Sequence, residues 1–204
     1  MGSSPVDAEQ TRLAGLQQYG PQLQSFLAPG ETLSAVVSAC LDSDIKDPPR
    51  KFQPRPSRLL GHLGGALERV APVLAPSETV LTGILNIASG KTWGGGWNSQ
   101  AGQLIIAAYP VKHVPGGGLL GTSLQFAVTD RRILVVYLPR RASKVPAGVI
   151  AEYGPGQLRN RPEPPPRRQK HRADLVFPDG SWIALQADSP QQADLLRHIF
   201  SAAA

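Results

Sequence analysis

The chain has 204 residues, enough for one full hydrophobic core, and 41% of them are apolar, slightly below the average of globular proteins. No stretch approaches the roughly 20 apolar residues that a membrane helix needs. Residues 1–9 carry neither the charged start nor the apolar core of a secretion signal. We therefore expect a cytoplasmic protein without a transmembrane segment, at most peripheral to the membrane. The single cysteine, Cys40, excludes an internal disulfide.

The formal net charge of +6 is distributed unevenly along the chain. Eleven of the 21 Lys and Arg residues lie between residues 131 and 172, a window whose only acidic residues are Glu152 and Glu163. The rest of the chain has more acidic than basic residues. Such an asymmetry indicates an anionic partner more strongly than the total charge does.

The N-terminal region is predicted to be mainly helical. A first helix is expected over 7–18, ended by Gly20-Pro21, and a strand over 32–41. A charged loop or linker with several prolines follows over 42–56. The clearest helical pattern of the chain occupies 57–71, where apolar residues recur at three- and four-residue steps.

The second half of the chain is predicted to consist mainly of strands. Strands are expected over 79–87, 103–108 and 149–153, with a glycine-rich loop at 89–102 between the first two. The proline-rich segment 155–169 is predicted to be an exposed, mostly extended loop.

The strongest strand signal is a hairpin at 124–138. Apolar and polar residues alternate over 124–129, which is the period of a half-buried strand. Residues 133–138 form an unbroken run rich in β-branched side chains, which predicts a strand buried on both faces. The short polar turn 129–131 joins the two strands near the centre of a sheet.

The chain ends with a second hairpin and a helix. Strands are expected over 172–177 and 182–187, on either side of the turn 178–181. Ser189 is the expected N-cap of the last helix, and Gln192 is expected to complete a capping box.

Three short motifs accompany this order of elements. They are Gly30-Glu31-Thr32, echoed by Ser77-Glu78-Thr79, before a strand, Val128 to Leu134 in the central hairpin, and Phe177 to Ser181 before the last strand. Together they resemble bacterial pleckstrin-homology-like domains, the group related to the GRAM domains. The resemblance implies a bent, partly open β-barrel plugged by its C-terminal helix. It also implies binding of lipid head groups, membranes or proteins.

We therefore expect an α+β fold: a pleckstrin-homology-like antiparallel β-barrel with a C-terminal capping helix, preceded by a helical N-terminal region. The N-terminal region spans 1–76, with one strand and a proline-rich linker, and the barrel domain spans 77–204. Whether 32–41 or 79–87 is the first barrel strand stays open, so the N-terminal region can also contribute to the barrel.

No pattern of catalytic residues emerges. Ser89-Gly90-Lys91-Thr92 resembles the end of a phosphate-binding loop, but Leu85 occupies the position of the glycine that this motif requires. Lys91 belongs either to a flexible hairpin loop or to an anion contact. The four histidines are isolated and Cys40 has no evident histidine partner, so we expect no metal, no cofactor and no enzymatic activity.

The candidate anion- or partner-binding site is a set of basic residues: Lys91, Arg131, Arg132, Arg140, Arg141, Lys144, Arg167, Arg168 and Lys170. In one interpretation these side chains are merely solvated. In the other, those at 131–144 gather on one barrel edge and those at 159–172 form a polybasic arm for an anionic partner.

Aromatic residues distinguish between the possible partners. Tyr153 is the only aromatic residue between Pro139 and Ala173. This disfavours nucleic acid as the partner, because sequence-reading modules stack bases on aromatic rings. Trp93 and Trp97 are expected either to pack internally or to enter a membrane interface.

These patterns predict a non-catalytic interaction module that docks on a protein partner or an anionic membrane surface. The alternative is a structural or assembly subunit that self-associates through its N-terminal helices. The oligomeric state and the identity of the ligand stay open.

Overall fold

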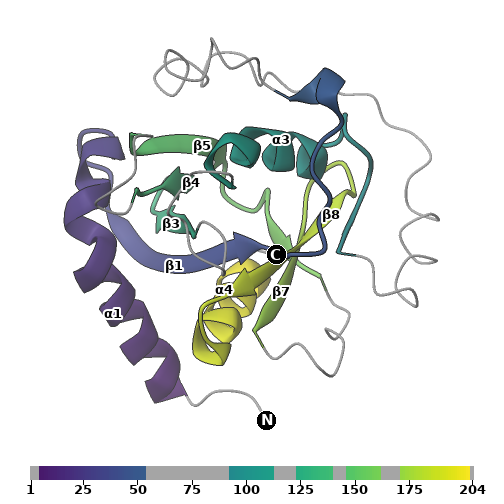
Figure 1. Cartoon of the computed structure of the whole chain (residues 1–204). Coiled ribbons are helices and arrows are strands. Elements are labelled where there is room, and N and C mark those ends of the chain that lie inside the picture. The colour runs from purple at the N-terminus through teal and green to yellow at the C-terminus, as the bar shows by residue number, and fades with distance from the viewer. Residues whose placement is uncertain (1–4, 54–91, 113–122, 140–145, 162–170, 203–204) are drawn as a thin grey trace.

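The computed structural model describes residues 5–53, 92–112, 123–139, 146–161 and 171–202. These residues form an α+β fold with one antiparallel sheet of eight strands and three α-helices, the last of them at the C-terminal end of the described chain (Figure 1). The predicted helix at 57–71 and the predicted strand at 79–87 lie outside the described residues. So does the expected domain boundary after residue 76.

The helices are α1 (Pro5–Leu23), α3 (Gln100–Lys112) and α4 (Pro190–Ala202), with short 3-10 turns η1 (Gln24–Phe26) and η2 (Arg50–Phe52). The strands are β1 (Leu33–Leu41), β2 (Trp93–Gly94), β3 (Leu124–Thr129), β4 (Ile133–Tyr137), β5 (Gly148–Tyr153), β6 (Arg159–Asn160), β7 (Arg172–Val176) and β8 (Trp182–Ala187).

Seven strands follow one path across the sheet in the order β5-β4-β3-β1-β8-β7-β6, and β2 pairs with β8 beside it. The sheet is open, because β5 and β6 are its two ends and do not pair with each other. The expectation of a barrel is therefore met only as a single antiparallel sheet. Strand β1 lies at the centre, where it pairs with β3 along most of its length and with β8 at its end. The N-terminal region thus shares one sheet with the later strands.

The central hairpin forms as predicted and explains the composition of β4. All five residues of β4 are buried. Ile133, Val135 and Tyr137 belong to the main core, whereas Leu134 and Val136 belong to a smaller cluster that also contains Leu23 of α1. A strand with helices against both faces needs apolar side chains at every position.

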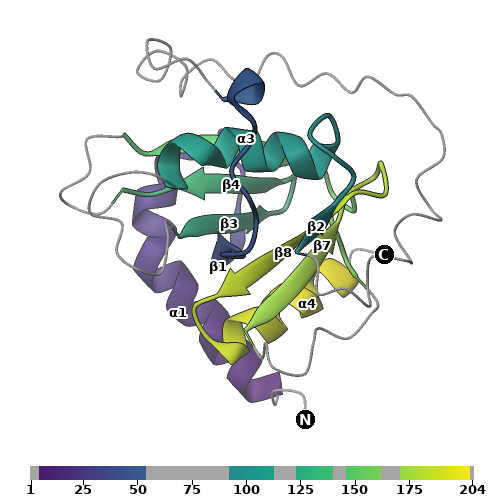
Figure 2. The ribbon, with the colours of Figure 1, turned by 45° about the vertical axis from the view of Figure 1, so that its right-hand side comes forward.

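The main core fills the space between the sheet, α3 and α4. Figure 2 shows α3 above the strands and α4 below them, while α1 lies along the outside. Residues of both α3 and α4 join the strands in the same buried cluster. The C-terminal helix therefore packs into the core of the sheet, as expected.

Helix α1 extends to Leu23, so the expected end before Gly20-Pro21 was wrong. The extra turn buries Leu23 completely in the smaller cluster. Close to the middle of the helix, a Cβ added at Gly15 would clash with the carbonyl oxygen of Val36 in β1. The helix thus lies directly on the backbone of β1. This tertiary packing overrides the local tendency of Gly20-Pro21 to end the helix.

The predicted strand at 103–108 is wrong, because these residues belong to α3. The helix buries Leu104, Ile105, Ala108 and Val111, which recur at helical spacing and pack into the main core. A short apolar run does not distinguish a buried helix from a buried strand by its pattern alone.

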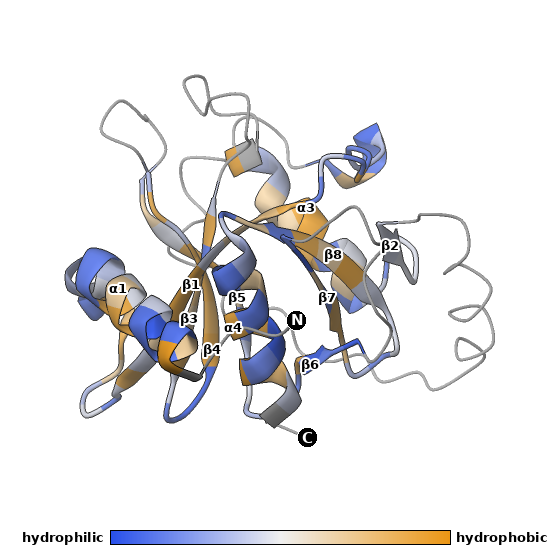
Figure 3. Cartoon of the chain, turned by 90° about the horizontal axis from the view of Figure 1, so that it is seen from below, coloured by the Kyte–Doolittle hydropathy of each residue, from blue (hydrophilic) through white to orange (hydrophobic). Residues whose placement is uncertain are grey.

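Helix α4 agrees with the sequence, and Figure 3 shows its hydrophilic side facing outward. Its capping box is only half formed. The backbone N–H of Gln192 donates to the hydroxyl of Ser189 at 3.2 Å, but the side-chain oxygen of Gln192 is buried without a hydrogen-bond partner. The reciprocal bond of a capping box is therefore absent. A further difference is the short strand β6, which lies inside the segment expected to be an extended loop.

Candidate functional site

A network of charged side chains joins the β3–β4 turn to the start of β1. Arg132 donates from Nε and Nη2 to the two carboxylate oxygens of Glu31, both at 2.8 Å. It also donates from Nη1 to Glu152 in β5 at 2.9 Å. The Glu31 side chain is fully buried and that of Arg132 is 22% exposed. Because both branches of its guanidinium bind carboxylates of the same chain, Arg132 has a structural role and stabilises the fold.

Glu31 is held in place by the turn that precedes β1. Its N–H donates to the carbonyl of Ala28 at 3.0 Å, and Gly30 has a φ of 73°, which is typical of a type II turn with proline at its second position. The carboxylate also accepts the N–H of Ala28 at 2.7 Å and the hydroxyl of Thr129 at 2.7 Å. The hydrogen bonds from Arg132 are the main cause that lowers the pKa of Glu31 to about 2.

Arg131 differs from its neighbour because its side chain is 53% exposed. Its guanidinium donates to the carbonyl of Gly30 at 3.2 Å and to that of Pro29 at 3.4 Å. These bonds hold the side chain along the turn while leaving much of its surface in solvent. Arg131 is therefore accessible, at the end of the sheet that holds Glu31.

The turn before β8 also has a structural role. Gly180 has a φ of 75°, and the side chain of Asp179 accepts the N–H of Ser181 at 3.0 Å. The same carboxylate accepts the N–H of Gln100 at 2.8 Å, and the hydroxyl of Ser181 accepts that of Ala101 at 3.0 Å. The turn thus caps the first residues of α3, whose N–H groups have no partner within the helix.

A second group of charged side chains comes from the residues that flank segment 162–170 in the sequence. Arg172 donates to Asp174 at 2.6 Å and 3.0 Å, and both side chains are almost entirely buried. Arg161 lies 3.9 Å from the same carboxylate and stacks over the ring of Trp182, 4.0 Å from its centroid. These two arginines of the basic window therefore stabilise the fold as well.

The register of the sheet aligns strand ends that are far apart in the sequence. Ala187 donates its N–H to the carbonyl of His171 at 2.8 Å, which extends the alignment to the start of β7. The remaining neighbours in this row, from β8 to β5, are Ala187, Ala39, Leu124, Tyr137 and Gly148. Five strands thus begin or end at one row of residues across the sheet, which we call the tether row; β3, β4 and β5 extend from it in one direction, and β7 and β8 in the other.

The tether row is where two of the predicted basic segments attach. Segment 140–145 connects the end of β4 with the start of β5, and segment 162–170 leads into His171. Arg131 and Arg132 lie at the opposite end of β4, whose five residues span on the order of 15 Å. The described residues therefore do not bring this pair to the attachment points of 140–145, in contrast to the predicted common edge.

Seven of the nine predicted site residues lie outside the described residues: Lys91, Arg140, Arg141, Lys144, Arg167, Arg168 and Lys170. The two that are described, Arg131 and Arg132, differ in accessibility, as above. The sequence analysis missed the roles of Glu31 and Glu152 as partners of Arg132. The signal for Glu31 was its place in the motif that opens β1.

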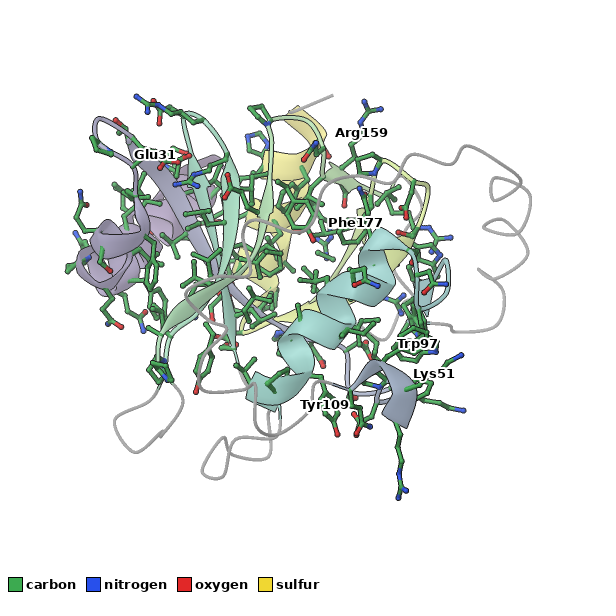
Figure 4. All side chains as sticks on the ribbon, turned by 90° about the horizontal axis from the view of Figure 1, so that it is seen from above. Glu31, Lys51, Trp97, Tyr109, Arg159 and Phe177 are labelled. Carbon is green, nitrogen blue, oxygen red and sulfur yellow. The ribbon has the colours of Figure 1, made fainter. Side chains whose placement is uncertain are left out.

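An aromatic corner lies beside the first turn of α3. Trp93 and Trp97 pack with ring centroids 4.6 Å apart, and Phe52 lies 6.2 Å from Trp97. The ammonium group of Lys51 lies 4.9 Å from the centroid of the Phe52 ring. Figure 4 shows Trp97 and Lys51 close together on the side of the molecule away from Glu31.

Burial keeps two potentially reactive side chains of the described residues, Cys40 and Tyr153, in their protonated form. Burial raises the pKa of the Cys40 thiol, whose sulfur donates to the carbonyl of Gln186 at 3.3 Å. Burial also raises the pKa of Tyr153. Among the described residues there is no group of three or more His, Cys, Asp or Glu that could hold a metal ion. Within the same residues, no helix has the length and apolar character to cross a membrane.

Comparison of the chain with family models, with curated proteins and with solved structures gave no match. The case for a function therefore depends on the fold and on its surfaces.

Proposed function

We propose that the chain is a non-catalytic interaction module, related to the pleckstrin-homology-like domains, that docks on an anionic membrane surface. The antiparallel sheet with a C-terminal helix in its core supports this kinship. The tether row carries the proposal, because two strongly basic segments attach to this one row of residues across the sheet.

The charge of the two basic segments is substantial. Segment 140–145 contains three basic residues and no acid, and segment 162–170 contains three basic residues and one acid, Glu163. Each cation near an anionic membrane contributes about 1 kcal/mol, and the attraction weakens as salt screens it. Together the two segments carry a net charge near +5, which is enough for salt-sensitive docking.

A membrane is the favoured partner because the docking charge is carried by short segments between strands. Arginine and lysine in such segments recognise an anionic surface without a fixed geometry, whereas a specific protein interface needs a packed core of buried side chains. Docking on an acidic protein is the competing outcome of the test below.

The assembly alternative stays a prediction. Helix α1 places Leu16 and Leu23 against the sheet, so this part of its apolar surface is used within the fold. Its most exposed apolar residues are Val6 and Leu13, at 62% and 44%. The second predicted N-terminal helix lies outside the described residues.

Flotation with lipid vesicles tests the proposal. Vesicles of phosphatidylcholine, with and without phosphatidylglycerol, are mixed with the protein at low and at high salt. We expect flotation only with the anionic vesicles and only at low salt. Absence of flotation at low salt would overturn membrane docking and leave an acidic protein as the partner class.

Two double variants locate the docking surface. Each removes two positive charges, so the two variants have the same net charge. Arg167→Ala/Arg168→Ala removes two cations from segment 162–170, which leads into His171, and we expect it to lower the bound fraction severalfold. Arg131→Ala/Arg159→Ala serves as the matched control, because these two exposed cations lie beside the ends of β4 and β7 that are farther from the tether row. Equal losses in both double variants would contradict docking through the segments attached to the tether row.

A further inference from the structure

Asp188 is an exposed acidic residue that directly follows the tether row. It comes after Ala187, the last residue of β8, whose N–H donates to the carbonyl of His171 at 2.8 Å. Segment 162–170 leads into His171, so Asp188 lies beside the point at which this basic segment joins the sheet. No other acidic residue is as close to the tether row in the sequence.

Two further observations place the carboxylate of Asp188 at the tether row. The hydroxyl of Ser123, the residue that precedes β3, donates to this carboxylate at 3.4 Å. After burial, the negative charge of Asp188 is the next cause of the raised pKa of the Cys40 thiol in β1. The carboxylate therefore contacts the start of β3, and its charge acts on β1.

A negative charge at this place counteracts the two basic segments. The five paired residues of the tether row are uncharged, and segments 140–145 and 162–170 attach to this row with a strong excess of positive charge. Charges that are closer than the Debye length, about 10 Å at 0.1 M salt, are only partly screened. An anionic surface that the basic segments attract is therefore repelled by Asp188.

We propose that Asp188 opposes docking and thereby keeps the attachment to an anionic membrane weak and reversible, a proposal that rests on the proposed function above. One unit of charge close to an anionic membrane changes the partition coefficient by roughly fivefold at low salt. Removal of the charge of Asp188 is therefore expected to strengthen docking by about this factor.

Flotation of Asp188→Asn with phosphatidylglycerol vesicles tests the proposal. Asparagine keeps a side-chain oxygen that accepts the Ser123 hydroxyl and removes only the charge. At about 0.1 M salt we expect the partition coefficient to rise about fivefold. Asp188→Glu retains the negative charge and should bind like the unmodified chain, and thermal unfolding verifies that each variant is folded.

Asp130→Asn is the matched control, because it makes the same change in net charge. Asp130 follows β3, whose six residues separate it from the tether row by on the order of 20 Å. Its side chain is 49% exposed, and asparagine keeps the oxygen that accepts the N–H of Thr32. Since this distance is about two Debye lengths, we expect less than about a twofold change in binding.

The Cys40 thiol reports the charge of Asp188 without a membrane. Its pKa can be followed through the pH dependence of its reaction with a thiol reagent, and Cys40 is the only cysteine of the chain. We expect a lower pKa of Cys40 in Asp188→Asn than in the unmodified chain, because a nearby negative charge is removed. An unchanged pKa would contradict the action of Asp188 at the tether row.

The outcomes separate the two proposals. Flotation of the unmodified chain without a gain in Asp188→Asn, or with an equal gain in Asp130→Asn, overturns the role of Asp188 and leaves anionic docking intact. Absence of flotation of the unmodified chain at low salt overturns the proposed function. A gain in Asp188→Asn that is absent in Asp188→Glu and in Asp130→Asn supports both.

Discussion

Removing the charge of Glu31 is the most informative perturbation of the fold. Glu31→Gln keeps the shape of the side chain but leaves the guanidinium of Arg132 with one carboxylate, Glu152, in place of two. Because the Glu31 side chain is fully buried, the remaining charge of Arg132 is poorly compensated there. We expect a clear loss of stability with no change in the overall fold.

The size of the loss follows from the pKa of Glu31. A shift from the ordinary value of 4.5 to about 2 corresponds to an upper limit of about 3 kcal/mol. The Arg132 side chain is 22% exposed, so solvent and Glu152 compensate part of its charge. We therefore expect Glu31→Gln to lower the free energy of unfolding by about 2 kcal/mol at pH 7.

The pH dependence gives an independent check of this reasoning. Because folding depresses the pKa of Glu31, its contribution is complete above about pH 5 and is lost as the pH falls toward 2. Urea unfolding between pH 7 and pH 2 should show this loss in the unmodified chain and not in Glu31→Gln. Glu152→Gln, which changes a more exposed partner, is the matched control and should cost less than about 1 kcal/mol. Equal stability of Glu31→Gln and the unmodified chain at pH 7 would refute the network.

Three further substitutions test separate contacts. Gly15→Ala should lower the urea midpoint by the equivalent of about 1 to 3 kcal/mol, because its Cβ meets the Val36 carbonyl; Gly20→Ala, with only an ordinary contact at 3.9 Å, should not. Asp179→Ala should cost about 1 kcal/mol through loss of the cap on α3, seen as a lower midpoint in thermal unfolding. Leu134→Ala should cost about 2 to 5 kcal/mol in urea unfolding, because the side chain is fully buried, and a loss below 1 kcal/mol would contradict the core under α1.

The strands were predictable where a single local pattern determines the structure. Residues 133–137 are apolar at every position and form a strand between two clusters, and the turns at 129–131 and 178–181 contain the polar and glycine residues that turns require. The wrong predictions concern segments whose structure is determined by contacts with residues far away in the sequence. Helix α3 was mistaken for a strand because its first N–H groups are capped by Asp179 and Ser181, about 80 residues away in sequence.

The candidate site was harder to predict because local sequence does not reveal the partner of a charge. Arg131 and Arg132 are adjacent, yet one is largely exposed and the other is paired with Glu31, which is 101 residues away. The three motifs that resemble pleckstrin-homology-like domains contribute the β1 turn, the Arg132 network and the cap of α3. These motifs therefore specify architecture, and the ligand of the chain has to be inferred from its surfaces.

The most direct test of anionic docking is flotation of the complete chain with phosphatidylglycerol vesicles at low salt, compared between the two double variants of equal charge. We predict that the bound fraction falls in Arg167→Ala/Arg168→Ala and is retained in Arg131→Ala/Arg159→Ala. Binding that is retained in the first variant, or lost equally in both, would contradict a docking surface at the tether row.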